Sequence, residues 1–108
     1  MASQREHPVA LFDSGVGGLT VLHECLVSLP EEDFLYLGDD AFFPYGTKSA
    51  TEITGRVKAC LGYLLDQRAK LLVIACNSAT ATSLDTARAL ASEYDVELVA
   101  VIEVSLPA

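Results

Sequence analysis

Residues 71–80 constrain the fold more than any other stretch, and they read Leu-Leu-Val-Ile-Ala-Cys-Asn-Ser-Ala-Thr. Five apolar residues in succession are typical of a strand that is buried on both faces of a parallel sheet. Asn77 and Ser78 are residue types that cap helix N-termini, so we expect a helix to begin directly after the strand. Cys76 then ends the strand, where open α/β sheets bind ligands, beside the positive end of a helix dipole that favours a thiolate. Cys76 is therefore the leading candidate functional residue.

Further apolar runs predict a total of four strands, which cover residues 9–12, 34–37, 71–75 and 98–102. Apolar residues at helical spacing predict helices between them, over about residues 18–28, 49–65 and 78–93. Strands that alternate with helices are typical of a parallel sheet with helices on both faces. Because crossover connections are right-handed, we favour the strand order 2-1-3-4. The expected fold class is a three-layer α/β/α domain with a four-stranded parallel sheet.

The second expected helix has the clearest start and the clearest apolar face. Ser49 and Glu52 fit a capping box, in which the two residues accept hydrogen bonds from each other's backbone. The apolar face consists of Ile53, Val57, Cys60, Leu61, Leu64 and Leu65. Cys60 lies on this face and Cys25 on the apolar face of the first helix, so we interpret both as core residues. Three scattered cysteines predict neither a disulfide framework nor a zinc site.

The overall charge disfavours some classes of partner. The chain has 108 residues, a formal net charge of -8 and no basic run, which argues against binding to nucleic acid or to an anionic membrane. Apolar residues make up 51% of the chain, enough for a packed core. The N-terminal residues contain no apolar signal segment, and no apolar run is long enough to span a bilayer. We therefore expect a cytoplasmic protein with reduced cysteines.

A glycine-rich turn follows the first strand, and residues 13–18 read Asp-Ser-Gly-Val-Gly-Gly. In the favoured strand order, the ends of the first and third strands flank the point where the topology switches, so this turn and Cys76 face one crevice. The turn opens a helix whose N-terminus can bind an anion. Two interpretations of Asp13 stay open: it caps the helix, or its carboxylate contacts a ligand ammonium or acts as a base.

The same turn supports an alternative function. Gly15 and Gly17 match part of the dinucleotide-binding fingerprint, but Thr20 stands where the third glycine belongs. Asp39 or Asp40, after the second strand, could take the place of the acid that binds a ribose. A dinucleotide- or phosphate-binding module is therefore the alternative, although it leaves the cysteine at the end of the third strand unexplained.

The loop after the second strand contains Phe42, Phe43 and the turn Pro44-Tyr45-Gly46. Aromatic side chains in such a loop either cover a pocket or pack among themselves. From the residues alone we favour a self-packed loop in which Tyr45 is half buried.

Three stretches, residues 12–21, 44–48 and 75–80, occur in an order and spacing that resemble the glutamate racemases of the aspartate/glutamate racemase family. The resemblance covers residues 9–103. It implies a fold of two similar α/β domains with the active site between them and no cofactor. It also implies that two cysteines on opposite sides of glutamate exchange its α-proton, which supplies D-glutamate for peptidoglycan in the bacterial cytoplasm. An aspartate racemase-like enzyme is the alternative within the family.

The resemblance implies roles for residues in each of the three stretches. Cys76 is similar to the first cysteine of the pair, the base that handles D-glutamate. Asp13 is similar to a residue that contacts the substrate and assists proton transfer. The implied substrate-binding residues are Asp13, Ser14, Tyr45, Gly46, Asn77 and Ser78.

The chain departs from the family pattern in several places. The second catalytic cysteine with its adjacent Thr-His is absent, no arginine precedes Pro44, and the usual Pro-Gly does not follow residue 103. We therefore expect a flexible N-terminus over residues 1–8, a racemase-like domain over residues 9–103, and a truncated connection over residues 104–108 to a missing C-terminal domain. The isolated chain is then expected to lack full activity, and the resemblance leaves room for a homodimer of the full-length enzyme.

The absent domain also suggests a third interpretation of the chain. A half-site without its partner domain exposes apolar surface that the partner normally covers. The chain is then a non-catalytic interaction protein that self-associates.

Overall fold

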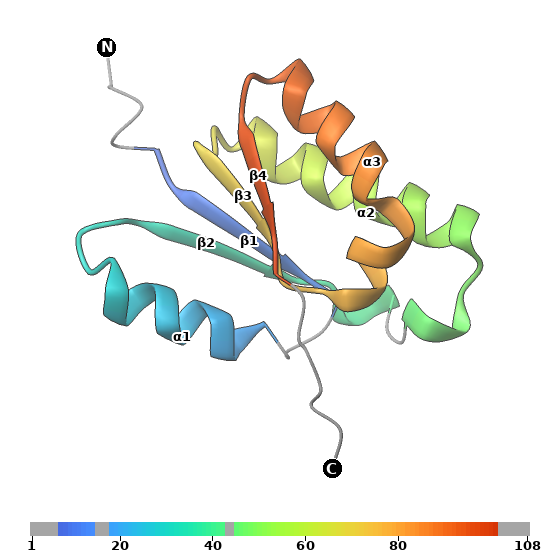
Figure 1. Ribbon diagram of the computed structural model, residues 1–108, viewed down its shortest axis with the longest axis horizontal. Helices are drawn as coiled ribbons and strands as arrows, with labels where there is room; N and C mark the ends of the chain where they lie inside the picture. Colours follow the sequence, from blue (N-terminus) through green and yellow to red (C-terminus); the bar gives the residue numbers. More distant parts are fainter. Residues whose placement is uncertain (1–6, 15–17, 43–44, 102–108) are drawn as a thin grey trace.

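The computed structural model describes residues 7–14, 18–42 and 45–101, which form one sheet flanked by helices (Figure 1). The strands are β1 (Val9–Asp13), β2 (Phe34–Gly38), β3 (Leu71–Ile74) and β4 (Glu97–Ala100). Neighbouring strands are parallel and the order is β2-β1-β3-β4, which confirms the predicted order. The strand ends differ from the predicted ones by one or two residues.

The described helices are α1 (Leu19–Ser28), α2 (Ala50–Asp66) and α3 (Asn77–Glu93). In Figure 1, α2 and α3 cover one face of the sheet and α1 lies on the other, which confirms the predicted three layers. Two short 3₁₀ turns, η2 (Asp40–Phe42) and η3 (Tyr45–Thr47), occupy the segment predicted as a loop. Within the described ranges, the helices are too short or too polar to cross a bilayer.

The main core lies between the sheet and the pair of helices α2 and α3. Alternate strand residues point into it, among them Phe12, Leu72 and Ile74. All six residues of the predicted apolar face of α2 are buried. Ser49 and Glu52 form the predicted capping box at the start of this helix. The sequence pattern of α2 therefore predicts both its start and the face that it buries.

The opposite face of the sheet carries a smaller core. Val9, Leu11 and Val73 are buried there, with partly buried side chains of α1 against them. No residue of α1 itself is buried, and Cys25 is only partly buried, so the prediction of a core position for Cys25 is wrong. A helix is about 10 Å wide and strands are about 4.8 Å apart, so a single helix covers about two strands. Without a neighbouring helix, the flank of α1 that carries Cys25 stays partly open.

The start of α3 differs from the prediction that Asn77 and Ser78 cap the helix. The N-cap residue is Cys76, whose backbone is extended and whose sulfur accepts a hydrogen bond from the Ala79 N–H. Cys76 is the last residue with strand-like backbone before the helix begins, so its side chain takes the capping position. Asn77 and the residue after it are the first residues of the helix.

The helix α3 is interrupted at Ser83. The backbone of this residue is not helical, with φ of -130° and ψ of 17°. Its buried hydroxyl forms a hydrogen bond of 2.9 Å with the hydroxyl of Thr54 on α2. The interruption divides α3 into a short first segment, which carries the N-cap, and a longer second segment.

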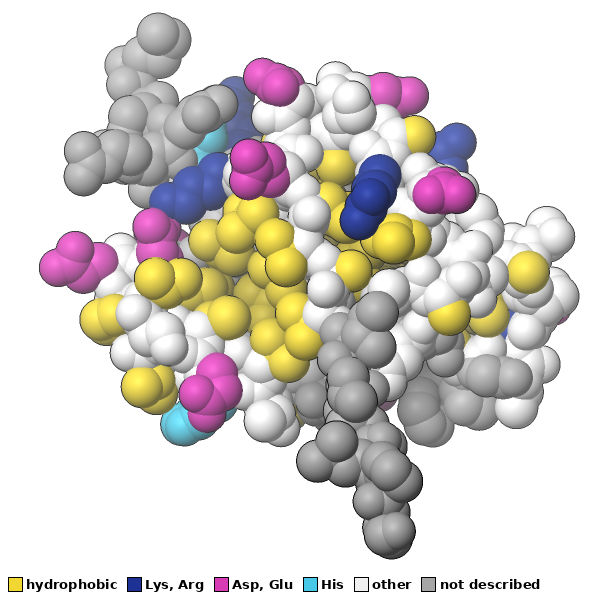
Figure 2. Space-filling view, viewed as in Figure 1, with side chains coloured by type: hydrophobic (Ala, Val, Ile, Leu, Met, Phe, Trp, Pro, Cys, Tyr) yellow, Lys and Arg dark blue, Asp and Glu magenta, His cyan; other side chains and the backbone are white. Residues whose placement is uncertain are grey.

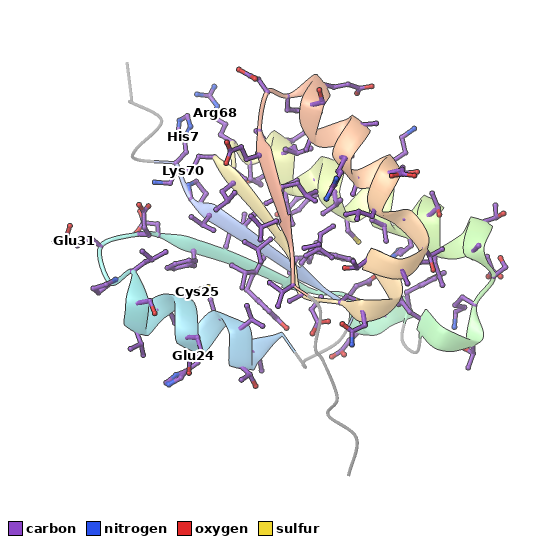
Figure 3. All side chains as sticks on the ribbon, in the orientation of Figure 1. His7, Glu24, Cys25, Glu31, Arg68 and Lys70 are labelled. Atoms are coloured by element: carbon purple, nitrogen blue, oxygen red, sulfur yellow. The ribbon has the colours of Figure 1, made fainter. Side chains whose placement is uncertain are left out.

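Basic side chains gather at the amino ends of the strands. Figure 3 shows His7, Arg68 and Lys70 close together there, at the start of β1 and just before β3. Lys70 forms an ion pair with Glu32. This group therefore lies at the opposite edge of the sheet from the glycine-rich turn and Cys76.

Candidate functional site

The carboxyl ends of three neighbouring strands are joined by backbone hydrogen bonds at one edge of the sheet. The Ala75 N–H donates to the Phe12 carbonyl at 2.8 Å, and the Asp39 N–H donates to the Asp13 carbonyl at 2.8 Å. The topology switches at β1, because β2 lies on one side of it and β3 on the other. Ligands bind at such switch points in open α/β sheets. The edge that carries Asp13 and the segment after β3 is therefore the candidate functional site.

Asp13 is a buried carboxylate that backbone amides hold in place. Its Oδ1 accepts the Ser14 N–H at 2.7 Å, and its Oδ2 accepts the Gly18 N–H at 2.5 Å. A Cβ on Gly18 would lie only 3.0 Å from the Asp13 Cβ and 3.2 Å from the Ala75 Cβ. A side chain at this position would therefore crowd both strand ends, and glycine avoids that crowding. The N-cap of α1 is Gly18, which has no side-chain cap, so Asp13 is not the capping residue. Its hydrogen bonds from the Ser14 and Gly18 N–H groups instead fix the orientation of its carboxylate.

Tyr36 is a partner of Asp13 that the sequence analysis does not identify. Its hydroxyl donates to the Asp13 Oδ2 at 3.4 Å. Burial and the negative charge of Asp13 raise the pKa of Tyr36 to about 12, so the phenol is protonated at neutral pH. Strand alternation is the signal that could have found it, because Tyr36 pairs with Leu11 and so lies on the face to which Asp13 points.

Cys76 is buried at the start of α3, in the core between the sheet and the helices α2 and α3. Its sulfur accepts the Ala79 N–H at 3.4 Å, and its carbonyl accepts the Thr80 N–H at 3.0 Å. The sulfur therefore lies in the N-terminal turn of α3 with one backbone donor. The Thr80 hydroxyl, one turn further on, is buried and has no hydrogen-bond partner among the described residues.

Tyr45 is fully buried, so the expectation of a half-buried side chain is wrong. Its ring lies 6.3 Å from that of Phe12 and 5.5 Å from that of Phe42, which meets it edge to face. Its hydroxyl donates to the Asp39 Oδ2 at 2.7 Å. Burial and the charge of Asp39 raise the pKa of Tyr45 well above its ordinary value. The self-packing of this loop is thus tighter than its residues suggest, because the phenol has a buried acceptor.

Asp39 is a buried carboxylate that Arg56 neutralises from α2. The Arg56 Nε donates to Oδ2 and its Nη2 donates to Oδ1, each at 2.6 Å. The guanidinium lowers the pKa of Asp39, against the opposing effect of burial. Because both Asp39 oxygens have partners within the chain, Asp39 is not available as the ribose-binding acid of the dinucleotide alternative. The sequence does not indicate this contact of Arg56, because no motif links it to Asp39, which lies 17 positions away.

Cys60 also contacts Asp39, and it is buried as predicted. Its sulfur lies 3.7 Å from the Asp39 Oδ2 and donates to it. Burial, with the charge of Asp39, raises the pKa of Cys60 to about 11. Cys60 is therefore a protonated thiol at neutral pH and not a nucleophile or base.

The remaining predicted site residues lie along the same edge. Ser14 is partly buried next to Asp13, Asn77 is exposed in the first turn of α3, and Ser78 follows it in that turn. Gly46 lies in η3 directly after Tyr45. Residues 15–17 of the glycine-rich turn and residues 43–44, which include Phe43 and Pro44, lie outside the described residues.

Comparison with known proteins finds relatives of one kind. No protein-family model matches the chain. A glutamate racemase of Roseiflexus sp. is 48% identical over 84 residues, which are 78% of this chain and 31% of the relative. A glutamate racemase of Clostridium botulinum (strain Kyoto / Type A2) is 39% identical over 106 residues, which are 98% of this chain and 40% of the relative. The chain thus spans about a third of the length of the curated relatives that it matches.

Solved structures give the same result. The glutamate racemase of Thermus thermophilus in complex with beta-chloro-D-alanine has a TM-score of 0.83 and 40% identity, over 94% of this chain and 38% of its own. That of Francisella tularensis in complex with D-glutamate has a TM-score of 0.85 and 36% identity, over 89% of this chain and 36% of its own. Over most of its length, the chain is therefore homologous to glutamate racemases and shares the fold of the matching part, which confirms the resemblance drawn from its three motifs.

Proposed function

We propose that this chain supplies one half of the active site of a glutamate racemase, an enzyme that interconverts L- and D-glutamate without a cofactor. The observation that carries the proposal is the placement of Cys76, as N-cap of α3, at the sheet edge that also carries the oriented carboxylate of Asp13. The homology to glutamate racemases over most of the chain supports the choice of substrate.

The reaction removes a proton from Cα of glutamate, which is a very weak acid. Negative charge then develops on the neighbouring carboxylate, and N–H donors aimed at it lower the barrier. We assign this role to the backbone N–H groups at the starts of α1 and α3. Cys76 acts as the base for D-glutamate and as the acid in the reverse direction. Asp13, held by two amides, contacts the substrate ammonium and assists proton transfer at the sulfur.

The other contacts to glutamate are assigned to residues on the same edge. We assign them to Ser14, Asn77 and Ser78, residue types whose side chains can form hydrogen bonds with glutamate. The Tyr45 hydroxyl already donates to Asp39, so we assign the contact from this loop to the backbone of Tyr45 and Gly46. The proposed site thus draws on the residues after β1, the loop after β2 and the first turn of α3.

Inversion at Cα needs a base on one face of the substrate and an acid on the other. Cys76 serves one face only. Cys60 is a buried, protonated thiol, and Cys25 lies on α1, on the other side of the sheet from the core that holds Cys76. We therefore assign the second cysteine to a second domain of the whole enzyme, in line with the much greater length of the relatives. We assign the whole enzyme to the bacterial cytoplasm, where D-glutamate enters peptidoglycan. A homodimer of the whole enzyme is compatible with this site.

Proton NMR of L- and D-glutamate in D₂O tests the role of Cys76. We expect the chain to exchange the α-proton slowly and without inversion, and Cys76→Ser to abolish the exchange. Cys25→Ser is the matched control, because its thiol is off the site, and it retains the exchange. Exchange that is equal in Cys76→Ser and the parent chain removes Cys76 from the mechanism. Rapid inversion of glutamate by the 108 residues alone would contradict the need for a second domain. The same measurement with L-aspartate in place of glutamate tests the aspartate racemase alternative.

A further inference from the structure

A network of buried polar and aromatic side chains connects α2 to the loop that carries Tyr45, and no step of the proposed reaction uses these side chains. Asp39 lies at its centre and accepts four hydrogen bonds from side chains of other elements, one of them from the Cys60 thiol at 3.7 Å. Two come from the Arg56 guanidinium, each at 2.6 Å, and one comes from the Tyr45 hydroxyl at 2.7 Å. The network therefore links a helix in the layer behind the site to a residue of the proposed site.

The two charges of this network differ greatly in exposure. The side chain of Asp39 is 4% exposed, whereas that of Arg56 is 38% exposed. A carboxylate that has left water depends on its partners, because removal of one partner leaves a buried charge uncompensated. The two-pronged contact of Arg56 also fixes the plane of the carboxylate, which a single donor does not. Arg56 therefore decides where the acceptor for the Tyr45 hydroxyl lies.

Arg56 reaches the same loop at a second point. Its Cζ lies 5.5 Å from the centre of the Phe42 ring, and the Nζ of Lys48 lies 5.1 Å from that centre. Phe42 in turn meets Tyr45 edge to face at 5.5 Å. Cations over the face of an aromatic ring attract it. Arg56 thus holds Tyr45 both through its hydroxyl, by way of Asp39, and through its ring, by way of Phe42.

We propose that Arg56 is a positioning residue of the glutamate site, which acts through Asp39 and Phe42 to hold Tyr45 and its loop in the conformation that binds glutamate. The inference rests on the proposed function. Arg56 takes part in no step of the reaction, but it is needed for the affinity of the site for glutamate. Its conservative variant, Arg56→Lys, keeps the charge and the contact to Phe42 but loses the fixed two-pronged contact to Asp39.

The test uses the whole chain with ¹³C-labelled tyrosine, and compares Arg56→Met, Arg56→Lys and Lys48→Met. Lys48→Met is the matched control, because it removes the other cation over Phe42 and leaves Asp39 untouched. Two quantities are measured by NMR: the chemical shift of the Tyr45 Cζ, assigned with Tyr45→Phe, and the Kd for L-glutamate. The Tyr45 resonance reports on Asp39, Arg56, Cys60 and Cys76, the charged and titratable groups that act on this phenol. Thermal unfolding of each variant separates loss of fold from loss of position.

We expect Arg56→Met to shift the Tyr45 resonance and to weaken glutamate binding about tenfold or more, a loss equivalent to about 1.4 kcal/mol. The Tyr45 chemical shift and the glutamate Kd of Arg56→Lys should lie between those of Arg56→Met and the parent. If Arg56→Met does not fold, the comparison of Arg56→Lys with Lys48→Met provides the test. Folded variants of Arg56 with an unchanged Tyr45 resonance and a Kd within about twofold of the parent overturn the inference. A parent chain that does not bind glutamate, while Arg56 variants still shift Tyr45, overturns the proposed function and with it the assignment to a glutamate site.

Discussion

The two faces of the sheet are built from the same strands but differ in how well they are covered. On one face, α2 contributes six buried residues to a core that also includes residues of α3. On the other face, α1 contributes none, and Leu19, Leu26 and Val27 are about half exposed or more. Strand alternation supplies apolar residues to both faces equally, so the difference lies in the helices. The comparison shows that one face holds the fold together and that the described residues cover the other face less completely.

The open part of the second face is an apolar groove beside α1. The groove has a volume of about 370 Å³ and is lined among others by Val21, Cys25, Leu29 and Val101. Figure 2 shows a broad apolar surface in this region, next to α1 and the front strand β4. Parallel sheets are normally covered on both faces. The candidate site lies at the edge where the two faces meet, since Asp13 points to one face and Cys76 belongs to the core of the other.

The largest expected difference between the two faces is in the free energy of unfolding. Leu64→Ala on α2 removes a fully buried side chain and should cost about 2–5 kcal/mol. Leu26→Ala on α1, where the side chain is 48% exposed, is the matched control and should cost less than about 1 kcal/mol. Urea denaturation followed by circular dichroism measures both. Equal losses would contradict the view that the α2/α3 face carries the stability.

The meeting point of the two faces should be the next most sensitive position. Gly18→Ala places a Cβ against both Asp13 and Ala75 and should cost on the order of 1–3 kcal/mol, because overpacking forces these groups apart. Gly55→Ala on α2 is the control, since its Cβ meets nothing within 4 Å, and should raise stability by up to about 1 kcal/mol. The same denaturation experiment compares them. A Gly18→Ala variant as stable as Gly55→Ala would show that the strand ends tolerate a looser contact.

The tyrosines of the two faces should ionise differently at alkaline pH. Tyr36 has its pKa raised to about 12, so the stability that it contributes is present below pH 10 and is lost as the pH rises from 10 to 12. Two pKa units correspond to about 2.7 kcal/mol, and partial exposure reduces this to on the order of 1 kcal/mol. Tyr45 should ionise only when the chain unfolds. We would follow tyrosinate absorbance during a pH titration of the parent, Tyr36→Phe and Tyr45→Phe, which separates the ionisation of the two tyrosines. Ionisation of both tyrosines near pH 10 would contradict their raised pKa values.

The smallest effect on stability is expected on the open face itself. Val99→Lys replaces a side chain that is 46% exposed on β4 and should change the free energy of unfolding by less than about 0.5 kcal/mol. It should nevertheless reduce self-association of the chain, because a charge interrupts the apolar surface. Ser92→Lys, at an exposed position of α3, is the control for added charge. Sedimentation velocity over a range of concentrations measures the association, and equal association of the two variants would exclude this surface as its cause.

The fold was largely predictable because its signals are local. The apolar stripe and the capping box of α2 both lie within this one helix and its N-cap, and strand alternation with right-handed crossovers leaves few strand orders. The incomplete burial of the apolar face of α1 was not predictable in the same way. The spacing of Leu22, Cys25 and Leu29 is that of a buried face, but burial also depends on a neighbouring element, and that is not a property of the helix itself.

The candidate site was predictable in its positions but not in its partners. Cys76 and Asp13 follow strands that the sequence places side by side, so topology alone brings them to one edge. The network of Asp39, Arg56 and Tyr45 depends on side chains that meet only after the chain has folded, and no spacing rule connects them. The cap of α3 was missed because Asn and Ser are far better capping residues than Cys, whereas the backbone geometry at the strand end decides the position.

The interruption of α3 at Ser83 has a consequence for how this chain can change over evolutionary time. The turn that carries the sulfur is followed by a break in the helix, and the break is bonded to α2 through Thr54. A continuous helix would transmit every tilt of its distal end to its first turn. Here the second segment of α3 can accumulate substitutions on its outer surface while the Cys76 sulfur keeps its position. The Ser83–Thr54 contact thus ties the break behind the turn that carries Cys76 to α2.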